Sequence, residues 1–299
     1  MAYSTGSDTI EQMYADIVQD LVPYYLDKTL LQNSAIIRSQ INVEGQGGGQ
    51  IRIPVANLPT SAASVAEGAS ILAAANSNLT PTAANITFQK RGVASDVTQE
   101  AVEDGLYDHI VGATLERLSG TLATATDSAG TAQMKTSFTS NDGVTGANVD
   151  FKQSFIMSPE AMAFGSSRVP TMKVWYNPNK DTHEFRGTTR NGFTVLRDTF
   201  GRTIKSSALG AGEAEANVVA IATSVANLRD VNAPVGADGN YVGLIDSGFE
   251  LALNKQLANA GATTIGALSD IGNNALRNAM VAVLAGCTLY RSNLLPDAS

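Results

Sequence analysis

The sequence predicts a mixed α+β protein, and three patterns support this class. Apolar and polar residues alternate at 51–55 and again at 86–90, as in strands; apolar residues recur at steps of three and four over 107–127, as in a long helix. From 154 to 292 shorter strand and helix patterns follow one another. A chain of 299 residues can bury roughly 75% of its unfolded surface, enough for one large domain or two smaller cores.

Residues 1–44 are predicted to form an N-terminal arm. Asp8 and Glu11 have the spacing of a helix N-cap and its reciprocal partner. Apolar residues then recur at helical spacing before Pro23, at Ile10, Met13, Tyr14, Ile17 and Leu21. We therefore expect an amphipathic helix in the arm.

Residues 45–92 are predicted to form an extended loop. The glycine cluster at 45–49 indicates a hinge; a phosphate-binding loop is disfavoured because Gln50 stands where a dinucleotide fingerprint needs its third glycine. Small residues dominate 57–84, and so long an excursion is unusual in a compact domain unless it has a function. We expect a projecting β-hairpin that contacts another copy of the chain through Ile51, Arg52, Ile53, Val55, Val65, Glu67, Gly68, Ile86 and Phe88.

Three further segments complete the predicted organisation. Segment 93–135 changes to a helical period after Val93, with Asp96 and Thr98 as candidate N-caps and a long helix over 107–127. Segment 136–212 contains predicted strands at 154–157, 172–176, 194–197 and 202–206, and a helix start at Ser158-Pro159-Glu160. Segment 213–299 is predicted to contain most of a helix at 212–230, a strand at 241–245 and a helix at 249–260. Residues 284–292 are predicted to form a strand pair, or a strand and a turn.

Composition restricts the classes of function. The net charge of −8, without a dense Lys/Arg cluster, disfavours sequence-specific or tight DNA binding. Aromatic residues make up only 6% of the chain, whereas deep ligand pockets usually recruit aromatics. Cys287 is the only cysteine, which excludes an intrachain disulfide and favours synthesis of the protein in a reducing cytoplasm. We expect its thiol to be packed and unreactive. No membrane span or signal peptide is predicted.

No set of residues predicts catalysis, a cofactor or a metal site. His109 and His183 are the only histidines, and neither belongs to a metal-ligand spacing. Acidic residues gather at Glu100, Glu103, Asp104 and Asp108, where a helix dipole accounts for them better than acid/base catalysis does. A Gly-x-Ser-x-Gly nucleophile elbow is absent from the sequence. We therefore expect the protein not to be an enzyme.

Several segments together resemble the major capsid proteins of tailed bacteriophages, with the Hong Kong 97-like fold. They are Val65-Ala66-Glu67-Gly68, Asp96-Val97-Thr98-Gln99-Glu100 with Asp104, the long helix ending at Asp127, Met157-Ser158-Pro159-Glu160-Ala161-Met162-Ala163-Phe164, Gly243-Leu244-Ile245-Asp246, and Tyr290-Arg291-Ser292-Asn293-Leu294-Leu295-Pro296. The resemblance implies that 1–44 is the arm, 45–92 the extended loop, 93–135 the peripheral domain with its spine helix, 136–212 peripheral and axial strands, and 213–299 the axial domain.

The resemblance also implies a function and partners. It predicts a structural protein that forms pentamers and hexamers of an icosahedral shell, encloses double-stranded DNA without sequence-specific binding, and reaches the virion capsid after assembly in the host cytoplasm. A separate scaffolding protein, a portal and decoration proteins are implied as partners, with no membrane. The alternatives are an encapsulin-like nanocompartment shell and, more remotely, a soluble enzyme.

Three departures from the family pattern modify these expectations. Residues 45–89 contain no lysine, so the loop has no nucleophile for an isopeptide crosslink, and we expect non-covalent contacts. The chain starts directly with the arm, which leads us to expect no fused scaffolding segment. The resemblance implies that segments like 243–296 precede segments like 157–206, whereas here they follow them, which indicates a permuted branch, a rearranged chain or a different correspondence of segments.

Overall fold

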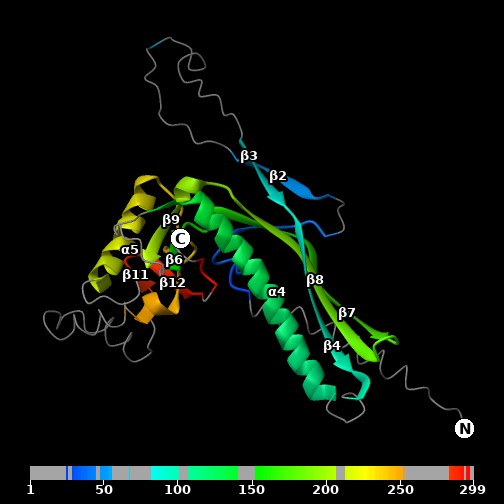
Figure 1. Ribbon diagram of the computed structural model, residues 1–299. Coiled ribbons are helices and arrows are strands. Elements are labelled where there is room, and N and C mark those ends of the chain that lie inside the picture. The colour runs from blue at the N-terminus through cyan, green and yellow to red at the C-terminus, as the bar shows by residue number, and fades with distance from the viewer. Residues whose placement is uncertain are drawn as a thin grey trace, which may run out of the picture.

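The computed structural model describes residues 25, 29–44, 48–55, 67, 82–100, 107–140, 152–206, 213–251, 253, 283–292 and 294–296. Within these residues the chain forms three sheets and two long helices (Figure 1). The elements are β1 (Ser39–Asn42), β2 (Gln50–Val55), β3 (Thr82–Thr87), β4 (Gln89–Thr98), α4 (Tyr107–Ser137), β5 (Thr139–Ser140), β6 (Lys152–Met157), β7 (Met162–Asn177), β8 (Thr182–Val195), the 3₁₀ turn η1 (Asp198–Phe200), β9 (Gly201–Ser206), α5 (Glu213–Asp230), β10 (Tyr241–Ile245), β11 (Val283–Leu284) and β12 (Cys287–Arg291).

The first layer combines α4 with a four-stranded sheet of order β1-β7-β8-β4. β7 and β8 form a long antiparallel ribbon, β4 extends it on one side, and β1 pairs in parallel on the other. α4 runs along β8 and β4 (Figure 1) and buries Leu115, Leu118 and Leu122. Gly187 in β8 permits this close approach, because a Cβ there would lie 2.9 Å from Leu122 Cδ1.

The second layer is a six-stranded mixed sheet of order β11-β12-β10-β6-β9-β5, packed against α5. All residues of β10 are buried, as expected for an apolar strand in the middle of a covered sheet. Ile221, Val225 and Leu228 of α5 lie in the same hydrophobic cluster as this strand. The cluster extends to Met134 of α4 and Leu31 of the arm, so one core joins the two layers.

Several predicted elements are confirmed. The strands predicted at 51–55, 154–157, 202–206 and 241–245 are β2, β6, β9 and β10, and the helix predicted at 212–230 is α5. The strand pair predicted within 284–292 is β11 and β12, joined by a tight turn at Ala285 and Gly286 with φ of 51° and 81°. Residues 247–251 and 253 are helical, as predicted for 249–260, while the rest of that helix and the arm helix near Ile10 lie outside the described residues.

The change to a helical period predicted after Val93 comes later, after Thr98. Residues 93–98 continue β4, with Val97 buried and Asp96 and Thr98 exposed on the opposite face. Residues 99 and 100 are helical, so Thr98 directly precedes the helical start, whereas Asp96 lies within the strand and is not an N-cap. The polar residues at alternate positions match a strand with one solvent-facing side. β4 therefore crosses the predicted boundary at residue 92.

The long helix and the ribbon are both longer than predicted. α4 continues to Ser137 instead of ending near Asp127, because Gly130, Thr131 and Met134 prolong its buried face. The helix start predicted at Ser158-Pro159-Glu160 is wrong: a turn leads here directly into β7, and the Ser158 hydroxyl donates a hydrogen bond to the Pro234 carbonyl at 2.5 Å.

The short strands predicted at 172–176 and 194–197 are pieces of β7 and β8, although Leu196 and Arg197 lie beyond the end of β8. Strands from the predicted segment 136–212 belong to both large sheets, since β7 and β8 lie in one, and β6 and β9 in the other. The boundaries of the segments as domains stay a prediction. None of the described helices is long and apolar enough to cross a membrane.

Candidate subunit interface

The predicted hairpin is confirmed as β2 and β3, and it packs against the ribbon formed by β7 and β8. β2 and β3 pair antiparallel with Ile51 opposite Ile86 and Val55 opposite Thr82, and Figure 1 shows them projecting from the two layers. Along β2, Ile51, Ile53 and Val55 are half-buried, while Arg52 is exposed. The outer edge of β2 has no partner strand among the described residues.

The foot of the hairpin is held by an apolar cluster within the chain. Ile86 and Phe88 are 0% and 7% exposed and lie in one cluster with Ala163 of β7. Partly buried side chains surround this centre: Ile41, Val43, Ile51, Ile53 and Leu196. The side chains of Ile86 and Phe88 are thus covered by their own chain, and their predicted contact with a neighbouring copy stays a prediction.

Two glycines allow the hairpin to lie so close to the ribbon. A Cβ on Gly192 of β8 would lie 2.3 Å from the Thr87 carbonyl oxygen, far inside normal contact. A Cβ on Gly165 of β7 would lie 2.9 Å from Phe88 Cε1. The angle at which the hairpin leaves the body therefore depends on bare backbone at both positions.

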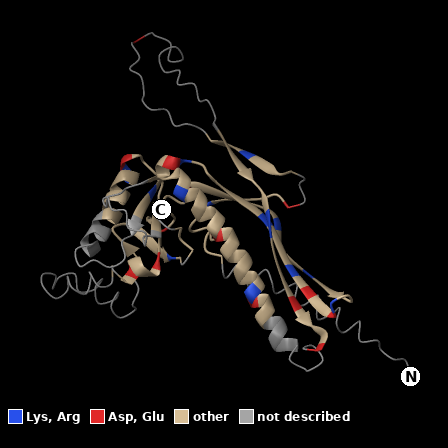
Figure 2. Ribbon diagram, in the orientation of Figure 1, with Lys and Arg blue, Asp and Glu red and all other residues tan. Residues whose placement is uncertain are grey.

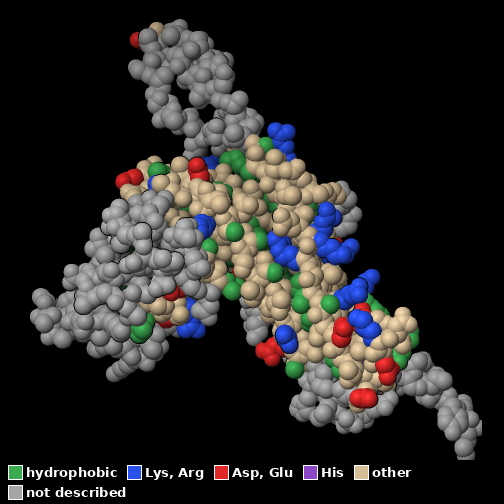
Figure 3. Space-filling model, viewed as in Figure 1, with side chains coloured by type: hydrophobic (Ala, Val, Ile, Leu, Met, Phe, Trp, Pro, Cys, Tyr) green, Lys and Arg blue, Asp and Glu red, His purple; other side chains and the backbone are tan. Residues whose placement is uncertain are grey.

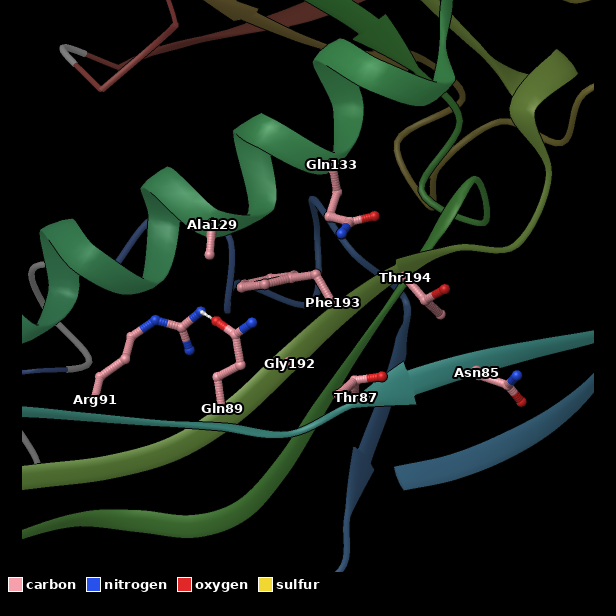
Figure 4. Close-up of a pocket in the computed structure, with 9 residues that line it drawn as sticks. All are labelled: Asn85, Thr87, Gln89, Arg91, Ala129, Gln133, Gly192, Phe193 and Thr194. Atoms are coloured by element: carbon pink, nitrogen blue, oxygen red, sulfur yellow. Dashed lines mark hydrogen bonds between the residues drawn. The ribbon is translucent and has the colours of Figure 1, made fainter. Parts of the chain in front are cut away.

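A polar pocket of about 130 Å³ lies where β3 passes into β4 (Figure 4). Its walls come from β3 and β4, from α4 and from β8: Asn85, Thr87, Gln89, Arg91, Ala129, Gln133, Gly192, Phe193 and Thr194. The Arg91 guanidinium donates to the Asn191 carbonyl oxygen at 3.3 Å, to the Asn191 side-chain oxygen, and to Gln89 Oε1 at 3.4 Å. Burial lowers the pKa of Arg91. These contacts connect the strand that leaves the hairpin to the centre of β8.

The arm reaches the same region through Tyr25. This side chain is 1% exposed, and its hydroxyl donates to Thr126 Oγ1 of α4 at 2.9 Å. The hydroxyl accepts hydrogen bonds from Gln32 Nε2 at 2.6 Å and from Asn191 Nδ2 at 3.2 Å. Burial is the main cause that raises the pKa of Tyr25. The arm, α4 and β8 thus meet in one buried hydrogen-bonded network.

Asp127 fixes the next part of the arm to α4. Its carboxylate oxygens accept backbone N–H groups of Leu30 at 2.9 Å and Leu31 at 3.3 Å. Burial raises the pKa of Asp127 to about 6, against the opposing effect of these two hydrogen bonds. Leu31 enters a notch over Gly130, where a Cβ would lie 2.4 Å from Leu31 Cδ1.

The structure reaches only part of the predicted interface. Glu67 is exposed in a turn, whereas Val65 and Gly68 of the loop lie outside the described residues. The predicted arm residues are also outside them: Ile10, Met13, Tyr14 and Ile17. That Tyr25 and Asp127 anchor the arm was not predicted from the sequence. The available signal was Asp127 itself, because a carboxylate on the apolar face of a helix needs a hydrogen-bonding partner when it is buried.

The residues considered for chemistry do not form a reactive site in the described part of the chain. No group of His, Cys, Asp or Glu there could hold a metal ion. His183 Nε2 lies 2.7 Å from Gln99 Oε1, and Cys287 is fully buried, with its thiol pKa raised to about 12 by burial. Glu100 is exposed, while Glu103, Asp104 and the side chains of Asp108 and His109 lie outside the described residues.

Comparison with known proteins gives a result for the fold alone. No protein-family model matches the sequence, and no curated protein does. Among solved structures, a chain of the bacteriophage JBD30 capsid is similar with a TM-score of 0.56 and 11% identity, over 89% of this chain and 92% of that one. The procapsid of bacteriophage JBD30 gives a TM-score of 0.54 and 9% identity, over 95% and 99%.

The two matches span 89% and 95% of this chain, so they concern its overall architecture. They favour neither the nanocompartment nor the enzyme among the alternatives. The α+β class and the phage-capsid fold expected from the sequence are confirmed. The chain has the fold of the phage capsid proteins.

Proposed function

We propose that this protein is the major capsid protein of a tailed bacteriophage, a structural protein and not an enzyme. Copies of it assemble into pentamers and hexamers of an icosahedral shell that encloses double-stranded DNA. The observation that carries the proposal is the likeness to the JBD30 capsid over 89% of this chain and 92% of that one. A match over nearly the whole of both chains concerns the complete architecture and not one shared motif.

The form of the subunit supports the same function. A hairpin projects from a body built of two sheets, and the outer edge of β2 has no partner strand among the described residues (Figure 1). A strand edge without a neighbouring strand can pair with another chain. Head-to-tail contacts of this kind close into a shell when the rotation between subunits permits it.

The finer parts of the proposal concern partners and place. A separate scaffolding protein guides assembly in the host cytoplasm, a portal occupies one vertex, and decoration proteins bind the outside of the virion. Segments 1–44, 45–92, 93–135, 136–212 and 213–299 act as arm, extended loop, peripheral domain, connecting strands and axial domain. The loop clasps a neighbouring subunit without a covalent bond, because residues 45–89 contain no lysine.

Particle size tests the proposal. The full-length protein, expressed alone and with the genes that flank its own, is analysed by sedimentation velocity and negative-stain microscopy. Rings or closed shells are expected. A protein that stays a monomer or dimer under both conditions would overturn the proposed function.

Hydrogen exchange gives a second readout on the same samples. Amides of β2 are expected to exchange more slowly in particles than in free subunits, because assembly covers the open edge. Equal protection in the two states would contradict the clasping role of the hairpin.

A further inference from the structure

Three basic residues lie directly opposite one another across the long ribbon. Lys90 of β4 is paired with Arg190 of β8, and Arg190 is paired with Arg168 of β7. We call these three residues the basic row. Neighbouring strands are about 4.8 Å apart, so the backbone positions of the row span about 10 Å.

The basic row carries uncompensated charge. Lys90 and Arg168 are exposed and Arg190 is half-buried, and within the described part of the chain none of the three forms an ion pair. Like charges directly opposite on neighbouring strands destabilise a sheet. An acidic group from outside the subunit would relieve the repulsion among the three residues of the row.

The surroundings of the row limit what that partner can be. Along the same strands, Asp96 of β4 lies directly opposite Glu184 of β8, six residues and about 20 Å beyond Lys90. Figures 2 and 3 show basic positions along the middle of the ribbon and acidic positions toward its far end. Asp96 and Glu184 are ion-paired with Lys180 and Arg186. The basic row forms no ion pair among the described residues, and its length of about 10 Å fits a single carboxylate.

The hairpin presents such a carboxylate. Glu67 is the only charged residue between Arg52 and Lys90, and it is exposed in a turn without an ion pair to any described residue. Several other described acids are ion-paired within the chain: Glu184 with Arg186 at 3.0 Å, Glu160 with Arg38 at 3.1 Å, and Glu250 with Arg291 at 3.7 Å. Glu67 is therefore the only residue from 53 to 89 that can form an ion pair with a neighbouring subunit.

We propose that Glu67 of one subunit docks on the basic row of a second copy, and that this contact sets the register between neighbouring subunits. The inference rests on the proposed function, because it requires subunits to assemble. Charge complementarity acts here mainly on specificity and encounter, since opposed like charges exclude a misplaced neighbour.

Charge reversal in both partners tests the contact. Glu67→Lys is compared with the double variant Lys90→Glu/Arg168→Glu, which places opposite charges beside Arg190 and therefore preserves the sheet. The two reversals change the charge of the row from +3 to −1, because each replaces a positive by a negative charge. Glu44→Lys, at another exposed acid without an ion pair in the described structure, is the matched control.

Particle yield is measured by sedimentation, and folding of the free subunits by circular dichroism. We expect Glu67→Lys and the double variant each to lower particle yield by about tenfold or more. The triple variant that combines them is expected to recover most of that yield, and Glu44→Lys to assemble as the wild type does.

Each other outcome overturns the inference. Normal yield for Glu67→Lys, or failure of the triple variant to recover while its free subunits remain folded, would exclude this pairing. If the double variant loses binding of a labelled DNA duplex but assembles normally, the row contacts DNA instead. If the wild type forms no particles, the proposed function fails, and the inference fails with it. If the wild type assembles but the variants behave differently from expectation, only the inference fails.

Discussion

The buried carboxyl of Asp127 makes the stability of the subunit depend on pH in a defined direction. Burial at 2% exposure raises its pKa from 3.8 to about 6 in the folded chain. Between these two values the folded chain keeps a proton that the unfolded chain releases. The free energy of unfolding therefore decreases as the pH rises from about 4 to about 6, and the decrease is complete above pH 6.

The magnitude follows from the difference between the two pKa values. A difference of one corresponds to about 1.4 kcal/mol, so a change from 3.8 to about 6 gives about 3 kcal/mol. Solvent screening reduces this figure little, because the side chain is almost completely enclosed by α4 and the arm. Such a change is a large fraction of the stability of a typical domain.

Urea unfolding of the free subunit between pH 4 and pH 7.5 measures this effect, with Asp127→Asn as the variant. Asparagine keeps the size of the side chain but does not titrate. The free energy of the wild type minus that of Asp127→Asn is expected to fall by about 3 kcal/mol across this range. Asp230→Asn, at an exposed carboxyl, provides the control.

Two results would refute the reasoning about Asp127. A difference that does not change with pH would mean that the carboxyl titrates alike in the folded and unfolded chain. A difference that rises with pH would mean that the two hydrogen bonds from Leu30 and Leu31 outweigh burial, and that the ionised carboxylate stabilises the arm.

Three further predictions concern packing. Gly192→Ala should lower the free energy of unfolding by about 1–3 kcal/mol, because its Cβ would lie 2.3 Å from the Thr87 carbonyl oxygen; Gly120→Ala on α4, with nothing within 4 Å, should not destabilise. Phe155→Ala should cost about 3–5 kcal/mol in thermal or urea unfolding, since this ring is 0% exposed; a cost below about 1 kcal/mol would contradict its place in the core. Cys287 should resist a thiol reagent at pH 8 until urea unfolds the chain, because the thiol is buried with a pKa of about 12; rapid labelling of the native subunit would show the opposite.

Regular apolar patterns made much of the fold predictable. The alternation in 51–55, the buried run at 241–245 and the helical stripe from Tyr107 each gave the right element, because burial of one face determines the period. Proline and glycine helped less. Ser158-Pro159-Glu160 has the composition of a helix start, but the hydroxyl of Ser158 bonds to Pro234, which only tertiary structure brings near.

The ribbon could not be predicted at its full length. β8 reads Thr-His-Glu-Phe-Arg-Gly-Thr-Thr-Arg-Asn-Gly-Phe-Thr-Val, and most of its buried positions carry polar or glycine residues. Such residues are tolerated because Thr189 and Asn191 form hydrogen bonds with the backbone of β7 and with Thr126. The same reason hid the anchoring network of Tyr25, since its partners are far apart in sequence.

The parallel pairing of β1 with β7 has a consequence for synthesis on the ribosome. Asn42 at the end of β1 pairs with Ser166 of β7, which lies 124 residues later in the chain (166 − 42). The ribosome must therefore add 124 residues before this partner of β1 has been synthesised. At about 5–20 residues per second this takes roughly 6–25 s. During that interval the nascent chain can form the β2–β3 hairpin, but β7, the strand with which β1 pairs, has not yet been synthesised. The four-stranded sheet is therefore completed late in the synthesis and folding of each subunit.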